Sequence, residues 1–323
     1  MIYNKLNYFF ENLIIQILST NIKFGRWFTK CFNLKFQQRN NKELSFYLKA
    51  KNDKFDIKKL PVAKGLTREI QLGNFVLLKE FDYVCKLNNL NYWLDFGTLL
   101  GAVRHKGFIP WDDDIDVSMP RNDYNNIISL FNKSTKNPDI YIEVIRSKHT
   151  PCMQYLKILH KKLPFLWVDI FPYDYTHIEL NSNNFNNINK NLNNLRQEIN
   201  NKKELLKYSL DDLNTFIQKE MSSILNNSAV TQKEELTGVI RSIDFPHGHS
   251  CWVYDYSDIF PLSDIEFEGY KFKTVNNIQK YLNSIFDNSY MEYPPQIELG
   301  HTLTLLMSKE ERKFLKKLIE QFN

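Results

Sequence analysis

The sequence lacks the patterns that mark several common protein classes. Its four cysteines are widely spaced and form no CxxC pair, so we expect no disulfide framework and a reducing compartment. It has no block of about 20 apolar residues that could span a bilayer. It also lacks the basic start and small-residue cleavage site of a secretory signal peptide. These absences favour a cytoplasmic protein.

The chain is not basic throughout. Residues 1–60 hold 12 Lys/Arg and 4 Asp/Glu, a local charge of +8, whereas the rest of the chain holds 30 basic and 33 acidic residues. A nucleic-acid binder is expected to be basic across its recognition face. Nucleic acid is therefore not an expected partner.

The basic N-terminal segment mixes apolar residues at helical spacing with cations and aromatic residues. The apolar set is Leu6, Phe10, Leu13, Ile14, Ile17 and Leu18. One interpretation is that residues 1–40 rest on an anionic membrane, at its inner face. The other is an ordinary helix packed on the body of the protein.

The rest of the chain is typical of a globular protein, with 43% hydrophobic and 14% aromatic residues in the whole sequence. Periodicity predicts helices over 66–88, with Thr67 as the cap, and over 121–131 and 309–322, and strands over 92–96, 141–145, 155–159 and 166–171. This order indicates an α/β or α+β fold with a mixed sheet. We expect an arm over 1–60 and a catalytic domain over 61–323, with a helical insertion at 181–240.

The stretch from Tyr92 to Pro120 carries the most informative pattern. A short apolar strand is expected to pass into a helical turn at Gly97-Thr98, and a second strand to carry Asp112, Asp114 and Asp116. Alternate residues of a strand share a face, so these three carboxylates would point the same way. Like charges on one face are tolerated mainly when a cation lies between them. The spacing therefore predicts a divalent metal site.

Asp169 is a candidate fourth ligand. It lies in the middle of an apolar strand, where a carboxylate is costly to bury unless it is paired or binds a cation. If this strand neighbours the strand with the aspartates, the four carboxylates would hold Mg²⁺ or Mn²⁺ and leave coordination positions open for substrate phosphates.

The residues between the two expected strands could bind phosphate. The backbone N–H groups of Gly97 and the hydroxyl of Thr98 are candidates, because a strand meets a helix there. Arg104, His105 and Lys106 are expected to add positive charge between the two elements. Together with a metal site they indicate phosphoryl-type transfer. Each residue also has an ordinary explanation: a Gly-Thr pair is usually a turn, and His105 is as well explained as a helix-end residue.

Two other features have competing interpretations. Trp111 either covers a substrate or closes the core, as most aromatic residues do. The sequence from His247 to Cys251 contains two histidines and a cysteine, but their spacing does not match common structural zinc sites.

The residues Gly97–His105, followed by Phe108–Asp116, resemble the signature of the LicD family, which includes bacterial phosphocholine transferases and is related to the fukutins. Segments 168–174, 260–269 and 281–295 are similar to its pattern as well. The resemblance implies a nucleotidyltransferase-like fold with a small mixed sheet that carries the metal carboxylates. It also adds Gly101 to the substrate-binding residues.

The implied reaction is transfer of a phospho-linked alcohol group from a CDP-activated donor to a sugar hydroxyl of a glycan or glycolipid, with release of CMP. The group would be phosphocholine, phosphoglycerol or a phosphopolyol. Asp114 and Asp116, with Asp112, are the expected catalytic residues, and Trp111 is an expected substrate contact. Two alternatives remain: a nucleotidyltransferase that uses an NTP, and a non-catalytic partner in glycan biosynthesis.

Overall fold

A computed structural model gives the fold. It describes residues 42–178, 182–225, 236–241, 243–244, 253–300 and 307–321. The chain divides into two compact units, residues 1–55 and 56–323. In the first unit, residues 42–52 are helical. The predicted membrane-binding segment, residues 1–40, lies outside the described residues.

The second unit contains helices and strands interspersed along the chain. The described helices are η1 (Ile57–Lys59), α3 (Gly65–Leu87), α4 (Phe96–His105), α5 (Arg121–Ser134), α6 (Ser182–Asn201), η2 (Lys203–Lys207), α7 (Leu210–Leu225), α8 (Tyr256–Ile259), α9 (Ile278–Phe286) and α10 (Lys309–Glu320). The described strands are β1 (Trp93–Leu94), β2 (Asp116–Pro120), β3 (Ile140–Arg146), β4 (Gln154–His160), β5 (Trp167–Thr176), β6 (Gly238–Arg241), β7 (Val253–Asp255), β8 (Ser263–Phe267) and β9 (Tyr270–Thr274). None of these helices is long and apolar enough to cross a membrane.

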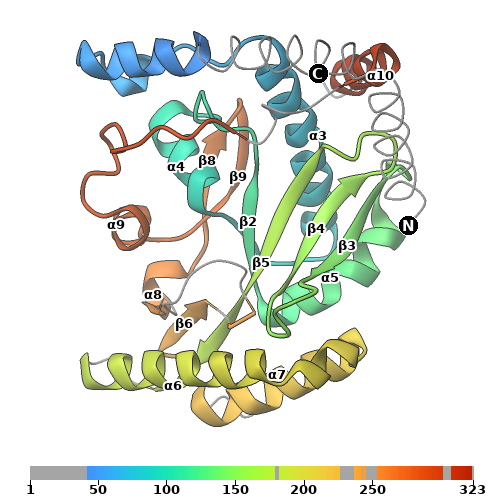
Figure 1. The fold of residues 1–323 in the computed structure, drawn as a ribbon, viewed down its shortest axis with the longest axis vertical. Helices are drawn as coiled ribbons and strands as arrows, with labels where there is room; N and C mark the ends of the chain where they lie inside the picture. The colour runs from blue at the N-terminus through green and yellow to red at the C-terminus, as the bar shows by residue number, and fades with distance from the viewer. Residues whose placement is uncertain are drawn as a thin grey trace, which may run out of the picture. The chain divides into compact units, whose positions relative to one another are not determined.

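The larger sheet is mixed, as expected. Its strand order is β1-β2-β5-β4-β3, and the far half of β5 pairs with β6, which pairs with β7. The β2–β5 pair is parallel, and the other pairs are antiparallel. Helices flank this sheet (Figure 1), so the prediction of a mixed sheet between helices is confirmed.

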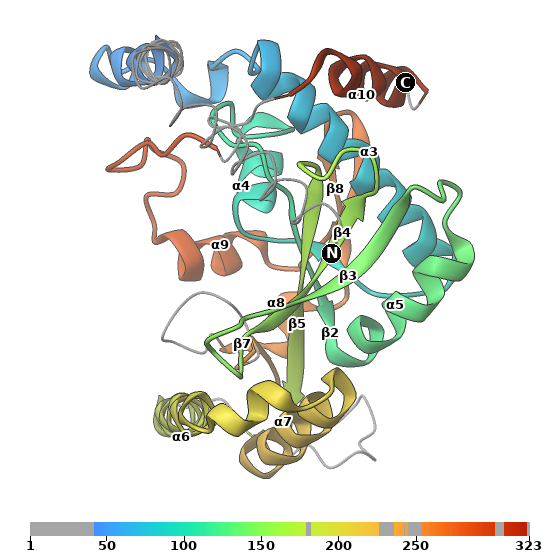
Figure 2. The same cartoon turned by 45° about the vertical axis from the view of Figure 1, so that its right-hand side comes forward.

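The two faces of the sheet differ. One is apolar, and the other, which we call the polar face, carries charged side chains among aromatic ones. The register puts Val117, Ile170 and Leu156 side by side on β2, β5 and β4, and all three are buried. Helices α3 and α5 pack against the sheet (Figures 1 and 2) and cover this apolar face. Because strand side chains alternate, the preceding residue of β2 and β5, Asp116 and Asp169, lies on the opposite face.

Helices α6 and α7 form a separate hydrophobic cluster near the end of β5 (Figures 1 and 2). Its buried residues include Leu192, Leu213 and Ile217 together with Ile240 of β6. The helical part of the predicted insertion therefore covers α6 to α7. Residues 238–240, predicted to belong to the same helical insertion, instead form part of strand β6 (Gly238–Arg241) of the main sheet.

Three local predictions around the central stretch are wrong. Helix α4 begins at Phe96 rather than after Gly97-Thr98, because the Asp95 side chain accepts a hydrogen bond from the Phe96 N–H and caps the helix. Strand β2 begins only at Asp116, so Asp112 and Asp114 precede it. Thr67 lies inside the first turn of α3, whose N-cap is Lys64.

Candidate active site

The parallel pairing of β2 and β5 brings two acidic side chains together. Asp116 and Asp169 are directly opposite in the register, and the Asp169 N–H donates to the carbonyl oxygen of Ile115 at 2.9 Å. Neighbouring residues on paired strands project to the same side of the sheet. The two strands are therefore neighbours, which is the condition set above for Asp169 as a fourth ligand, and Asp169 faces the same side as Asp116.

Asp112 and Asp114 precede the first residue of β2 and extend this row of acids. Exposure still alternates along the segment: Asp112 and Asp114 are half-buried, whereas Asp113 and Ile115 are buried. Burial, followed by the charge and hydrogen bond of Asp114, raises the pKa of Asp112 well above its usual range. The pKa of Asp116 is raised in the same way by burial and by the charges of Asp114, Asp169 and Asp112. The four carboxylates therefore form one mutually repelling group, which we call the acid cluster.

Hydrogen bonds from two helices hold the backbone of the acid cluster. From α3, the amide of Gln71 donates to the carbonyl of Asp112 at 2.7 Å, and that of Asn74 donates to the carbonyl of Asp113 at 2.7 Å. From α4, the Thr98 hydroxyl accepts the N–H of Asp116 at 2.8 Å. Thr98, predicted to bind phosphate, thus anchors the start of β2.

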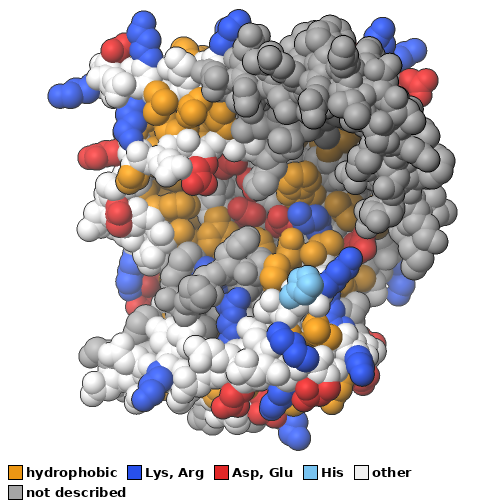
Figure 3. Space-filling model, viewed as in Figure 1, with side chains coloured by type: hydrophobic (Ala, Val, Ile, Leu, Met, Phe, Trp, Pro, Cys, Tyr) orange, Lys and Arg blue, Asp and Glu red, His pale blue; other side chains and the backbone are white. Residues whose placement is uncertain are grey.

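A cavity of about 410 Å³ opens beside Asp112. Three of the predicted substrate-binding residues, Gly97, Arg104 and Trp111, line it, and much of the remaining wall comes from residues 286–298. The rings of Trp111 and Tyr293 are nearly parallel, at 18° and with 6.4 Å between centroids. Figure 3 views one face of the molecule and shows acidic side chains beside basic and hydrophobic ones in its hollowed middle.

Two glycines permit close approach at this site. A Cβ on Gly97 would lie 3.0 Å from a carboxylate oxygen of Asp112, so glycine lets this acid lie against the first turn of α4. A Cβ on Gly101 would lie 2.5 Å from the carbonyl oxygen of Gly107. Gly101 therefore packs α4 against the loop that leads to the acids, and it does not line the cavity.

The three predicted phosphate-binding cations have different surroundings. The guanidinium of Arg104 donates to the carbonyls of Tyr290 and Glu292 at 3.0 and 3.2 Å, which holds the cavity wall. His105 accepts the Nε–H of Arg104 at 3.0 Å, and burial, with the charge of Arg104, lowers the pKa of His105 to about 3. His105 is therefore neutral, which corrects the expectation that it adds positive charge. Lys106 is exposed and does not line the cavity.

Sequence reasoning missed Asp95, which joins four elements under the site. Its fully buried carboxylate accepts hydrogen bonds from Ser118 at 2.6 Å, Tyr281 at 2.7 Å and Tyr173 at 3.2 Å, besides capping α4. Burial raises the pKa of Asp95, and these hydrogen bonds oppose the rise. An acid inside an apolar strand directly before a helix was the available signal.

The acid cluster suits a hard divalent cation in its chemistry. All four groups offer carboxylate oxygens, the ligands that Mg²⁺ and Mn²⁺ prefer, and their mutual repulsion would fall if a cation bound. Among the described residues, however, no three acidic, histidine or cysteine side chains already surround one point. Cation binding would therefore require side-chain rotation. The alternative zinc residues, 247–251, lie outside the described part of the chain.

The mixed sheet and its carboxylates on adjacent strands define a nucleotidyltransferase-like domain. Residues 89–207 match a family model described as "LicD/FKTN/FKRP, nucleotidyltransferase domain". The chain is 27% identical over 254 residues to the lipopolysaccharide cholinephosphotransferase LicD of Haemophilus influenzae, an alignment that covers 72% of this chain and 94% of that protein.

Shorter matches are confined to a small part of the chain. The chain is 44% identical over 47 residues to the human ribitol 5-phosphate transferase FKRP, an alignment that covers 15% of this chain and 10% of that protein. It is 46% identical over 52 residues to the uncharacterized protein RP689 of Rickettsia prowazekii, which is 16% of this chain and 20% of that one. Residues 89–207 thus match the model of a LicD-type domain, and the chain is similar to two proteins named as phosphotransferases, which confirms the family resemblance.

Proposed function

We propose that this protein transfers a phospho-linked alcohol group from a CDP-activated donor to a sugar hydroxyl of a glycan or glycolipid and releases CMP. The observation that carries the proposal is the pairing of Asp116 with Asp169 on adjacent strands, next to Asp112 and Asp114 and beside a cavity of about 410 Å³ that Asp112 lines. Similarity to a lipopolysaccharide cholinephosphotransferase over 94% of that protein supports the same chemistry.

In this proposal, Asp112, Asp114, Asp116 and Asp169 would hold Mg²⁺ or Mn²⁺, which would supply positive charge against the donor phosphates. The chain's own residues position the reactants. Gln71, Asn74 and Thr98 fix the backbone under the carboxylates. Arg104 holds the cavity wall through two carbonyl groups, and its part in binding the donor is indirect.

The cavity wall favours choline among the candidate groups. Trp111, Tyr290 and Tyr293 contribute aromatic rings, and Glu292 and Glu298 contribute negative charge. A quaternary ammonium is bound by such aromatic and anionic surroundings, whereas glycerol and ribitol are neutral. Of the other tryptophans, Trp93 is fully buried in the core.

An assay of released products tests the proposal. The full chain would be incubated with Mg²⁺, a lipopolysaccharide acceptor and CDP-choline, CDP-glycerol, CDP-ribitol or an NTP in separate reactions. We expect CMP release that depends on metal and acceptor and is fastest with CDP-choline. Pyrophosphate release from an NTP would support a nucleotidyltransferase instead, and the absence of turnover with every donor would support a non-catalytic partner.

A further inference from the structure

Lys157 continues the row of charged side chains across the sheet. It lies on β4 directly opposite Asp169, which lies opposite Asp116 on β2. The three side chains therefore share the polar face. The Lys157 ammonium lies 3.0 Å from a carboxylate oxygen of Asp169, and the two side chains are only 17% and 14% exposed.

Aromatic rings fix the position of this ammonium. Its nitrogen lies 4.7 Å from the ring centroid of Trp167 and 5.7 Å from that of Tyr155. Cation–π attraction stabilises a lysine held over such rings. The ammonium is thus held beside the acid cluster by its ion pair and by two aromatic rings, in contrast to the exposed Lys106.

We propose that Lys157 is a donor-binding residue of the transfer site. It serves as the counter-cation of Asp169 until a divalent cation binds to the acid cluster. A carboxylate oxygen that is paired with the ammonium is less available to a metal ion, so Lys157 and the cation compete for Asp169. With the cation bound, the ammonium donates to a phosphate oxygen of the CDP-linked donor, a usual role of lysine. The inference rests on the proposed function.

The first test measures Mn²⁺ binding to the full chain by titration calorimetry without nucleotide. Lys157→Met keeps an apolar stem but removes the competing charge, so we expect Mn²⁺ to bind about three- to tenfold more tightly. Lys157→Arg keeps the charge and should bind Mn²⁺ as the unmodified protein does. Equal or weaker Mn²⁺ binding by Lys157→Met would overturn the inference.

The second test measures the affinity for CDP, which carries both phosphates of any CDP-linked donor, at saturating Mn²⁺. Lys157→Met should bind CDP about tenfold more weakly, since one charge-assisted hydrogen bond is lost. If Lys157 only stabilised the fold, its replacement by Met would not tighten Mn²⁺ binding and at the same time weaken CDP binding. Unchanged CDP affinity in this variant overturns the inference.

Lys162→Met is the matched control. Lys162 also pairs with an aspartate, Asp139 at 2.6 Å, and lies 5.0 Å from the ring of Phe314, but it contacts none of the acid cluster in these pairs. Both affinities should be unchanged in this variant. If the unmodified protein binds no Mn²⁺, the proposed metal dependence fails as well. If it binds Mn²⁺ and Lys157→Met behaves identically, only the role of Lys157 fails.

Discussion

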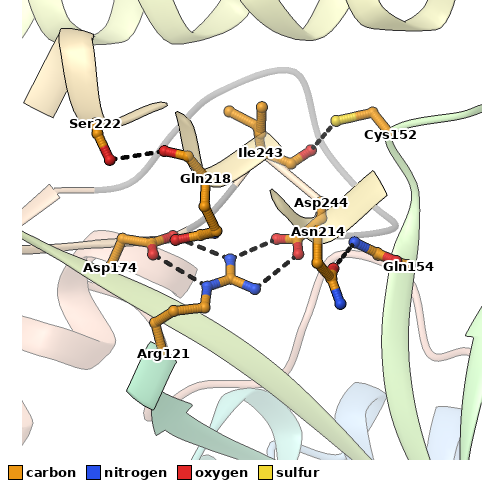
Figure 4. A network of polar contacts seen from close by, with 9 residues as sticks. All are labelled: Arg121, Cys152, Gln154, Asp174, Asn214, Gln218, Ser222, Ile243 and Asp244. Carbon is orange, nitrogen blue, oxygen red and sulfur yellow. Dashed lines mark hydrogen bonds and ion pairs between the residues drawn. The ribbon is translucent and has the colours of Figure 1, made fainter. Parts of the chain in front are cut away.

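Strand β5 carries two acids, the buried Asp174 and the half-buried Asp169, whose surroundings are opposite in kind. Asp174 faces the guanidinium of Arg121, which bonds it at two distances of 3.0 Å and also bonds Asp244 at 2.9 and 3.0 Å (Figure 4). Asp169, five positions earlier, instead lies beside the carboxylate of Asp116 and the ammonium of Lys157.

The difference separates a structural charge cluster from a candidate functional one. Around Arg121 each carboxylate oxygen has a donor at hydrogen-bond distance, and the group is almost fully buried. In the acid cluster, burial and repulsion raise the pKa of Asp112 and Asp116, so the isolated protein bears a cost that a bound cation would lower. Groups perturbed in this way beside a cavity are candidates for function.

The largest expected effect is on stability, from Arg121→Met. Removal of the guanidinium leaves Asp174 and Asp244 buried without their cation, so the free energy of unfolding should fall by about 3–5 kcal/mol. Urea unfolding followed by circular dichroism measures it. Arg312 makes a similar two-bond contact with Glu69 but is 50% exposed. Arg312→Met should therefore cost less than about 1 kcal/mol, and equal losses in both variants would contradict the comparison.

Asp116→Asn should have the converse effect, with activity lost and the fold retained. CMP release should fall by about 10²- to 10³-fold, as for removal of one electrostatic stabiliser of a transition state. The melting temperature should not fall, because one repelling charge is removed and the backbone bond to Thr98 persists. Asp264, an exposed partner of Lys273, provides the control, since Asp264→Asn should leave CMP release unchanged. Near-normal activity in Asp116→Asn would remove Asp116 from the site.

The smallest expected effect concerns His105, a titratable group that is buried in its neutral form. The pKa of His105 falls from 6.5 to about 3 in the folded protein, so its unfolded form binds the proton more readily. Stability from this group is complete above about pH 6.5 and is lost as the pH falls toward 3. His105→Gln should therefore lose less stability between pH 7 and 5 than the unmodified protein, by urea midpoints at each pH. Parallel curves for the two proteins would contradict the neutral assignment.

The sequence by itself determined the local patterns on which the site depends. The apolar periodicity predicted α5, β3 and β4 close to their observed bounds, since strongly patterned elements are stabilised by burial of one face. The spacing of Asp112, Asp114 and Asp116 predicted that they act together. The position of Asp169 within an apolar strand predicted it as a candidate fourth ligand. The predicted end of β1 and the predicted start of α4 were wrong, because Asp95 caps α4 and this cap outweighed the glycine signal.

Only the tertiary structure decided which side chains meet. Strand register pairs Asp169 with Asp116 on one side and with Lys157 on the other, and a shift of one residue would reverse the face of every side chain. The contacts of Arg104 with Tyr290 and Glu292 join residues more than 180 positions apart. Such pairings depend on chain topology rather than on local composition. No local pattern could therefore predict that Arg104 holds the cavity wall or that Lys157 lies beside the acid cluster.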